Sequence, residues 1–352
     1  MVSDEVRLKV VLPERLNGLR RTGRGVYVAT QESIRAELDK FIPGLDSLPA
    51  RYVPQGNEKQ RLEIARKNGN AVLLSGPTGV GKSLLVYDYA AENGLPLLVF
   101  TANEDATDWK MRGSLAIHMI PAMDEEGRMH DLKVQVFSHA QVAMAAMADR
   151  PVILFIDELH KIREGVTSLL HSIANPTERK LYCYEMTGEY YKLHPESMLV
   201  GALNPSYGEG GIDRLDAALR RRLPTIHLDM PGQETVVKIV LANFKKLDPK
   251  TVELVKKLAE VQAAIVTARS GVEERSPSAV VDARLDTQTL SSIIESPSPA
   301  SIVETIRAVT SGLPVMDAVE MYMVNTIVTD FGHARRALIS YVDDKLPKSL
   351  KG

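Results

Sequence analysis

The sequence has little cysteine, few large aromatic residues and no long apolar run. Cys183 is the single cysteine among 352 residues, so neither an intrachain disulfide nor a cysteine-based zinc site can form. A chain without disulfides suits a reducing compartment, which predicts a cytoplasmic protein. No stretch approaches the roughly 18 apolar residues of a membrane-spanning helix, and the first residues lack the apolar core of a signal peptide. We therefore expect neither a membrane span nor secretion.

An excess of one charge is also missing. The 43 basic and 45 acidic side chains nearly cancel, whereas nucleic-acid-binding domains usually carry a clear basic surface. One Trp and six Phe leave few rings on which bases could stack. The basic stretch over residues 15–24 is more typical of a solvated segment near a terminus. Nucleic acid is therefore not the expected partner.

The most informative stretch is a glycine-rich loop between an apolar strand and a helix-compatible segment. Its residues 76–83 read G-P-T-G-V-G-K-S, which is the spacing of a phosphate-binding loop. In such a loop the glycines let several backbone N–H groups converge on one anion, while Lys82 reaches the terminal phosphates and Ser83 binds Mg²⁺. A nucleoside triphosphate with Mg²⁺ is the expected ligand. The residues expected to hold it are Gly76, Pro77, Thr78, Gly79, Val80, Gly81, Lys82, Ser83 and Leu84.

Two acids follow an apolar strand further along the chain. The run Val152–Ile156 leads directly into Asp157 and Glu158. We expect Asp157 to hold Mg²⁺ together with Ser83, and Glu158 to orient or deprotonate the water that attacks the terminal phosphoryl group. An aspartate after a strand can instead cap a helix. The glycine loop in the same chain favours the catalytic interpretation.

Two further positions suit phosphoryl transfer. Asn204 follows another apolar strand, and its amide can position the attacking water or contact the phosphate. The alternative is an ordinary Asn-Pro turn. Residues 220–222 are all arginine, and a guanidinium at this place can complete the site by spreading its donors over a phosphoryl oxygen. The alternative is a solvated helix end.

Short apolar runs alternate with helical segments between residues 51 and 232. The expected strands are Ala71–Leu74, Leu97–Thr101, Val152–Ile156, Met198–Leu203 and Leu223–Leu228. Such runs are typical of a parallel sheet buried on both faces, so we predict an α/β core that binds its ligand at the carboxyl ends of the strands. Residues 233–352 read as a smaller helical domain with a flexible insert around 269–299. Residues 1–50 form an N-terminal extension of unknown role, with a helix over Gln31–Phe41.

Together these motifs resemble the AAA+ ATPases, and in detail their MoxR group. Within that group they resemble the CbbQ, NirQ and NorQ branch and its relative, the gas-vesicle protein GvpN. The resembling segments are Tyr52–Pro54, Gly76–Ser83, Glu104–Trp109 with Gly113, Asp157–Glu158, Thr187–Glu189 with His194–Pro195, and Asn204–Tyr207. The resemblance implies an AAA+ P-loop core with a central parallel sheet, a small α-helical lid domain after it, and hydrolysis of ATP with Mg²⁺.

The resemblance also implies an assembly and a task. Members form rings, usually homo-hexamers, that remodel or activate a client protein with a partner carrying a von Willebrand A domain. A hairpin before the asparagine strand and an insertion after the second strand face the pore or the client, and these match Leu181–Leu193 and about Leu115–Lys133. An ordinary hairpin is the alternative for the first segment. The family's arginine finger, which enters the neighbouring subunit's nucleotide site, falls on Arg222, with Arg220 second and Arg221 third.

One residue of the family pattern is missing. The family's lid carries an arginine in a Ser-Thr-Arg or Ser-Pro-Arg run, but this sequence has Ala300 at that place, and another alignment offers Arg336. Two other functions remain open. One is a nucleic-acid-translocating motor, since related rings move DNA. The other is a nucleotide-gated scaffold with negligible turnover, against which Glu158 argues.

Overall fold

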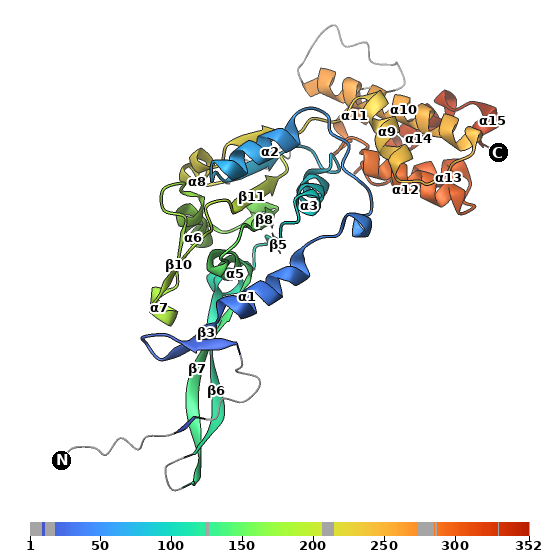
Figure 1. Cartoon of the computed structure of the whole chain (residues 1–352). Coiled ribbons are helices and arrows are strands. Elements are labelled where there is room, and N and C mark those ends of the chain that lie inside the picture. Colours follow the sequence, from blue (N-terminus) through green and yellow to red (C-terminus); the bar gives the residue numbers. More distant parts are fainter. Residues whose placement is uncertain are drawn as a thin grey trace.

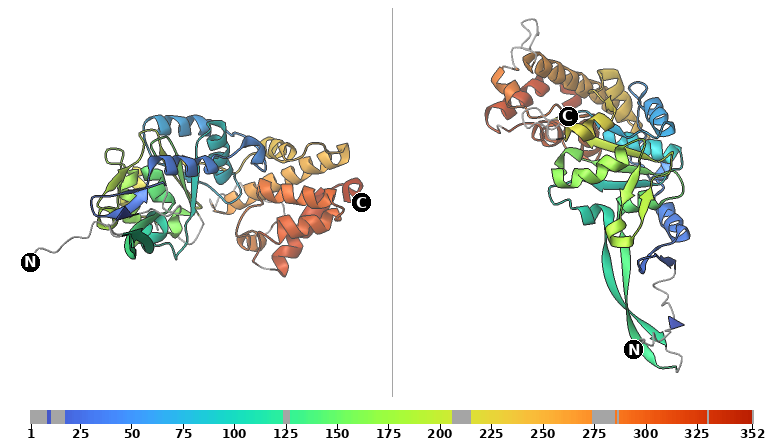
Figure 2. Two further views of the ribbon diagram at one scale, coloured as in Figure 1. Left: turned by 60° about the horizontal axis from the view of Figure 1, so that its bottom comes forward. Right: turned by 90° about the vertical axis from the view of Figure 1, so that its left-hand side faces the viewer.

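The computed structural model describes residues 9–10, 18–123, 127–205, 215–273, 285, 287–329 and 331–351. It shows an α/β core, a β-sheet that projects from the core, and a C-terminal group of helices (Figure 1). The projecting sheet and the C-terminal helices lie at opposite ends of the core (Figures 1 and 2). Part of the expected insert around 269–299, namely residues 274–284 and 286, lies outside the described residues.

The sheet of the core has five parallel strands among the described residues. In spatial order these are β12 (Thr225–His227), β4 (Val72–Ser75), β11 (Met198–Leu203), β8 (Ile153–Asp157) and β5 (Leu97–Thr101). Successive side chains alternate between the faces: Leu73 and Leu154 pack into one hydrophobic cluster, and Leu74 and Phe155 into another. Both faces are buried, which confirms the predicted parallel sheet.

Helices cover both faces of this sheet. On one side lie α2 (Glu58–Lys67) and α3 (Lys82–Glu92), and on the other lie α1 (Gln31–Leu38), α5 (Gln141–Met147), α6 (Glu164–Ala174) and α8 (Ala217–Arg222). Helix α1 begins after Thr30, whose hydroxyl oxygen accepts a hydrogen bond from the Ser33 N–H. A 3₁₀ turn over Asp39–Phe41 continues it, so the helix expected over Gln31–Phe41 is confirmed.

A second sheet joins an insertion to the N-terminal residues. Its spatial order is β1 (Lys9–Val10), β6 (Gly113–Met123), β7 (Met129–His139), β3 (Val26–Ala29) and β2 (Leu19–Arg21). Strands β6 and β7 form a long antiparallel hairpin between α4 (Asp108–Arg112) and α5. The insertion expected over about Leu115–Lys133 is therefore this hairpin, which starts earlier and ends later than expected.

The N-terminal strands also contact a short ribbon that precedes β11. This ribbon consists of β9 (Lys180–Tyr182), α7 (Tyr184–Thr187) and β10 (Tyr190–Lys192). Arg20 donates two hydrogen bonds to the Glu189 carboxylate, at 2.7 and 2.6 Å, and the Arg24 guanidinium lies 4.4 Å from the ring centroid of Tyr184. Because β3 pairs with β7 at the same time, residues 18–29 connect the hairpin to the ribbon.

The C-terminal helices pack around a hydrophobic cluster of their own. They are α9 (Gln233–Ala242), α10 (Pro249–Glu273), α11 (Thr287–Ser291), α12 (Pro299–Thr310), α13 (Val315–Val319), a π-helical turn (Glu320–Val324), α14 (His333–Lys345) and α15 (Lys348–Lys351). Helix α10 ends at Glu273, so it extends into the segment expected as a flexible insert around 269–299. Within the described residues, no helix is long and apolar enough to cross a membrane.

Candidate functional site

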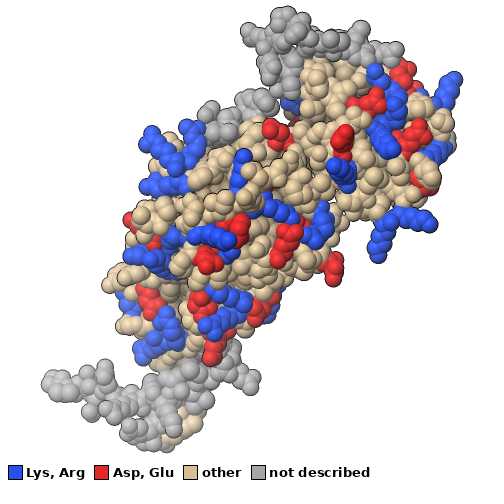
Figure 3. Space-filling model, turned by 45° about the horizontal axis from the view of Figure 1, so that its top comes forward, with Lys and Arg blue, Asp and Glu red and all other residues tan. Residues whose placement is uncertain are grey.

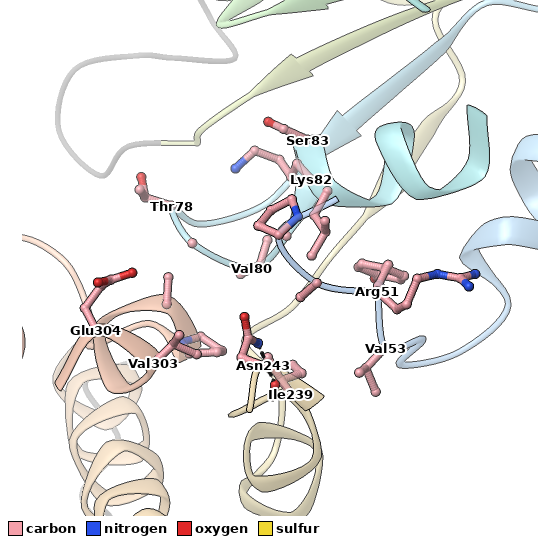
Figure 4. A pocket seen from close by; sticks show the side chains of 18 of the residues that line it. Arg51, Val53, Thr78, Val80, Lys82, Ser83, Ile239, Asn243, Val303 and Glu304 are labelled. Atoms are coloured by element: carbon pink, nitrogen blue, oxygen red, sulfur yellow. Dashed lines mark hydrogen bonds between the residues drawn. The ribbon is translucent and has the colours of Figure 1, made fainter. Parts of the chain in front are cut away.

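A cavity of about 390 Å³ lies where the glycine loop meets the C-terminal helices. Its walls are the loop with the start of α3, the linker over Pro49–Val53, and helices α9 and α12. Figure 4 shows Lys82 and the loop on one side, with Val303 of α12 and Ile239 of α9 on the opposite side. The cavity lies at the carboxyl end of β4, where an open α/β sheet binds its ligand.

The glycine loop has a backbone that requires glycine. Gly79 and Gly81 have φ angles of +78° and +97°, a region that side chains with a Cβ rarely adopt. A Cβ on Gly76 would lie 2.2 Å from the carbonyl oxygen of Leu228. The loop leads directly into α3, which begins at Lys82, so the positive end of the helix dipole points at the cavity and favours an anion there.

Lys82 is the buried cation of this site, with 8% of its surface exposed. Its ammonium donates to the carbonyl oxygens of Gly76 and Pro77 at 2.6 and 2.8 Å. Burial lowers the pKa of Lys82, and the negative charges of Glu158 and Asp157 partly offset that effect. A buried cation is costly unless an anion pairs with it, so the position suits the terminal phosphates.

Ser83 and Asp157 bring two oxygen ligands together. The Ser83 hydroxyl donates to Asp157 Oδ2 at 3.0 Å, while Asp157 Oδ1 accepts the N–H of Glu158 at 3.0 Å. Mg²⁺ prefers oxygen ligands and commonly takes one or two from the protein, with phosphate oxygens and water completing its shell. The pair therefore fits the predicted magnesium position.

Asn204 bridges the predicted base and the phosphate-binding lysine. Its Nδ2 donates to Glu158 Oε1 at 3.1 Å, and its Oδ1 accepts from the Lys82 ammonium. Strand β11 lies between β4 and β8, which is why a residue at its end reaches both. Glu158 itself has a φ of +55°, an uncommon backbone conformation for a residue with a Cβ. Its Oε2 lies 3.5 Å from His160 Nε2 and from Lys161 Nζ.

The linker wall is anchored by a buried carboxylate on α3. Asp88 is fully buried and accepts hydrogen bonds from Arg51 and Lys59. Burial alone raises the pKa of Asp88, but these hydrogen bonds outweigh it and lower the pKa below its usual value. Arg51 lines the cavity, so this network holds the linker against it.

The arginines of α8 lie away from the cavity of their own chain. Arg220 and Arg221 are exposed, and Arg222 donates from Nη1 to the carbonyl oxygen of Ala218 at 2.7 Å. These three residues do not line the cavity. The structure thus brings together the predicted loop, acids and asparagine, and leaves the predicted finger arginines outside this group.

Helix α12 contributes an arginine that the sequence analysis missed. Ala300 lines the cavity, and so does Arg307, about two turns further along the same helix face. The Arg307 Nη1 lies 2.6 Å from Glu304 Oε1. Arg336 is exposed on α14, donates to the carbonyl oxygen of Gly332 and does not line the cavity. A helical wheel drawn from Ala300 would have identified Arg307.

Over its core the chain is similar to one family model and to several curated proteins. Residues 71–223 match the family model described as AAA domain (dynein-related subfamily). Protein NorQ of Paracoccus denitrificans is 30% identical over 189 residues, covering 54% of this chain and 63% of NorQ, which is less than two thirds of that relative. Protein CbbQ of Hydrogenophilus thermoluteolus is 29% identical over 210 residues, which cover 60% of this chain and 70% of CbbQ. The solved structure of a Thermotoga maritima RuvB mutant is 17% identical in sequence. The match covers 83% of this chain and 70% of the RuvB chain, with a TM-score of 0.42.

Proposed function

We propose that this chain, which is similar over its core to the AAA-domain family model and to the proteins NorQ, CbbQ and NirQ, is an AAA+ ATPase of the MoxR type. It binds ATP with Mg²⁺ in the cavity beside the glycine loop and hydrolyses it to ADP and phosphate. The observation that carries this proposal is the convergence of Lys82, Glu158 and Asn204 at the carboxyl ends of three neighbouring strands. As in the resembling rings, the energy of hydrolysis would remodel or activate a client protein.

Each residue of the site has a distinct chemical task in this proposal. Lys82 and the loop N–H groups bind the β and γ phosphates. Ser83 and Asp157 would hold Mg²⁺, which neutralises charge on the phosphate oxygens. Glu158 accepts the proton of the attacking water. Asn204, which contacts both Lys82 and Glu158, aligns that water with the γ phosphate.

A neighbouring subunit would complete the site. The α8 arginines do not line the cavity of their own chain. Arg220 and Arg222 lie at the carboxyl end of α8, where Arg220 is exposed and Arg222 is partly buried. In a ring with head-to-tail interfaces, that helix end can enter the next subunit's nucleotide site. A homo-hexamer and a von Willebrand A-domain partner follow from the family resemblance and form part of the proposal.

A protein client is favoured over nucleic acid. The formal net charge is −2, and Figure 3 shows basic and acidic side chains interspersed over most of the face it presents. A nucleic-acid motor needs a continuous basic track for the phosphate backbone. The alternative of a scaffold without turnover is disfavoured because Glu158 is hydrogen-bonded to Asn204, which also contacts Lys82.

The proposal is tested by separating ATP binding from hydrolysis. Glu158→Gln keeps the shape of the side chain and removes the base, so ATP affinity should persist while phosphate release falls at least about a hundredfold. Lys82→Ala should abolish tight ATP binding in calorimetry. Glu178→Gln, an exposed position after α6, is the matched control and should leave turnover unchanged. Wild-type protein that releases no phosphate above background, as a purified assembly with Mg²⁺ and ATP, would contradict the proposal and favour the scaffold.

A further inference from the structure

The ribbon β9–β10 has an outward face that the nucleotide site does not use. Its register places Tyr182 opposite Tyr190, and Lys180 opposite Lys192. Because side chains alternate along a strand, these four residues share one face, while Leu181 on the other face is buried in the core. Figure 1 shows β10 and α7 near β3, at the base of the projecting hairpin. The ribbon therefore faces outward at the end of the core opposite the C-terminal helices.

This face is unfavourable for the stability of the ribbon. Two lysines directly opposite each other repel, and within the described residues neither forms an ion pair with a carboxylate. The Lys180 ammonium lies 4.8 Å from the Tyr190 ring centroid. Tyr182 and Tyr190 are 48% and 57% exposed, with their ring centroids 6.5 Å apart. Two positive charges and two large rings are thus presented to the surroundings.

A polar hollow of about 260 Å³ continues this face between α4, α6 and β9. The residues that line it are Asp108, Arg112, Ser168, Leu169, Ser172, Lys180 and Tyr182. Arg112 is held there by its ion pair with Asp108 and by a hydrogen bond of 2.5 Å to the Tyr182 carbonyl oxygen. Arg112 and Asp108 neutralise each other, so the remaining charge of the hollow is the positive charge of Lys180. Cations and hydroxyl groups are the side-chain donors that bind carboxylates.

We propose that the Lys180/Lys192 face, meaning Lys180, Tyr182, Tyr190 and Lys192 with the adjoining hollow, binds an acidic, extended segment of the client polypeptide. The inference rests on the proposed function and names the feature of the client that is recognised. Carboxylates of the segment lie between the two lysines and in the hollow, where they remove the repulsion of the ribbon. The tyrosine rings cover the aliphatic parts of the segment.

The size of the charged face favours a polypeptide over nucleic acid. Two lysines and one small hollow match a few carboxylates, whereas proteins that bind nucleic acid through its backbone commonly make roughly six to ten phosphate contacts. Arg20, which lies beside the ribbon, is already paired with Glu189. The charge available for a partner is therefore limited to the face itself.

The test measures peptide binding by fluorescence anisotropy with the full-length protein. The probe is a labelled Gly-Ser peptide with glutamate at every second position, and the matched probe carries glutamine instead. We expect the glutamate peptide to bind more tightly. Replacing both lysines, Lys180→Gln with Lys192→Gln, should weaken its binding about tenfold, the scale of two surface ion pairs, without lowering the melting temperature, because repulsion is removed. Lys245→Gln with Lys246→Gln, exposed after α9, makes the same charge change and should bind normally.

Basal ATP hydrolysis of each variant is measured in parallel and should be unchanged, since the ribbon does not line the nucleotide cavity. Equal binding of the glutamate and glutamine peptides would overturn the inference. So would an equal loss of glutamate-peptide binding in the Lys180/Lys192 variant and in the Lys245/Lys246 variant. Tighter binding of a labelled oligo-dT than of the glutamate peptide would also overturn it and assign the face to nucleic acid. A wild-type protein without ATP hydrolysis would contradict the proposed function instead, so the two failures are distinguishable.

Discussion

Among single residues, Asn204 has the most consequential position. It accepts a hydrogen bond from Lys82 and donates one to Glu158, so the proposed phosphate-binding cation and the proposed catalytic base contact the same side chain. In the proposed mechanism the Lys82 ammonium turns toward a phosphate, and the Asn204 oxygen then loses its donor. Through its other hydrogen bond, Asn204 would transmit a change at the γ phosphate to Glu158.

Arg307 is a cavity-lining residue that the sequence analysis did not predict. It lines the cavity from α12, where the sequence has Ala300 at the place of the family's lid arginine. Arg307→Ala should weaken ATP affinity about tenfold, the scale of one charge-assisted hydrogen bond to phosphate, as measured by calorimetry. Ala300→Ser should leave the affinity unchanged. Arg336→Ala is the second control; a loss of affinity there with none in Arg307→Ala would place the lid contact on α14 instead.

At the scale of elements, the projecting hairpin depends on one glycine. Gly113 connects α4 to β6 with a φ of +119°, and a Cβ there would lie 2.3 Å from the Ser138 carbonyl oxygen. Gly113→Ala should therefore cost about 3 kcal/mol or more, from backbone strain and overpacking together. Gly127 also has a positive φ of +80°, but no atom of the described residues lies within 4 Å of a Cβ added there, so Gly127→Ala should cost only about 1–2 kcal/mol.

Thermal melting of the full chain compares these two glycine variants. The melting temperature should fall clearly further for Gly113→Ala than for Gly127→Ala. Equal melting temperatures would mean that the junction of α4 and β6 relaxes around the added methyl group. In that case the hairpin would not be fixed to the core at this point.

At the scale of the whole molecule, local patterns predicted the core and distant contacts escaped prediction. The glycine loop and Asp157 were readable because a few adjacent residues define each motif, and the apolar strands because burial on both faces leaves a continuous run. The pairing of Val26 with Gln135 joins segments far apart in the chain, and no local signal encodes it. Arg307 was missed because the face that α12 turns to the loop is set by packing of the C-terminal helices.

The proposed arginine finger depends on the proposed assembly of subunits into a ring. Within one chain, Arg222 donates to its own helix while Arg220 is exposed, so both belong in the test. If the site is shared between subunits, a subunit with an intact loop needs only a neighbour with intact arginines. Hydrolysis would then depend on ring formation. An arginine finger raises the rate of phosphoryl transfer roughly 10³- to 10⁵-fold, so subunits without it should have little activity.

The measurement that tests this account most directly is ATP hydrolysis by mixed rings. One partner carries Lys82→Ala and the other carries Arg220→Ala with Arg222→Ala, and each should be inactive alone. In an equal mixture, about one quarter of the interfaces combine an intact loop with intact arginines, so about one quarter of the wild-type turnover should return. Mixed rings that are verified by native mass spectrometry and still release no phosphate would contradict the shared site.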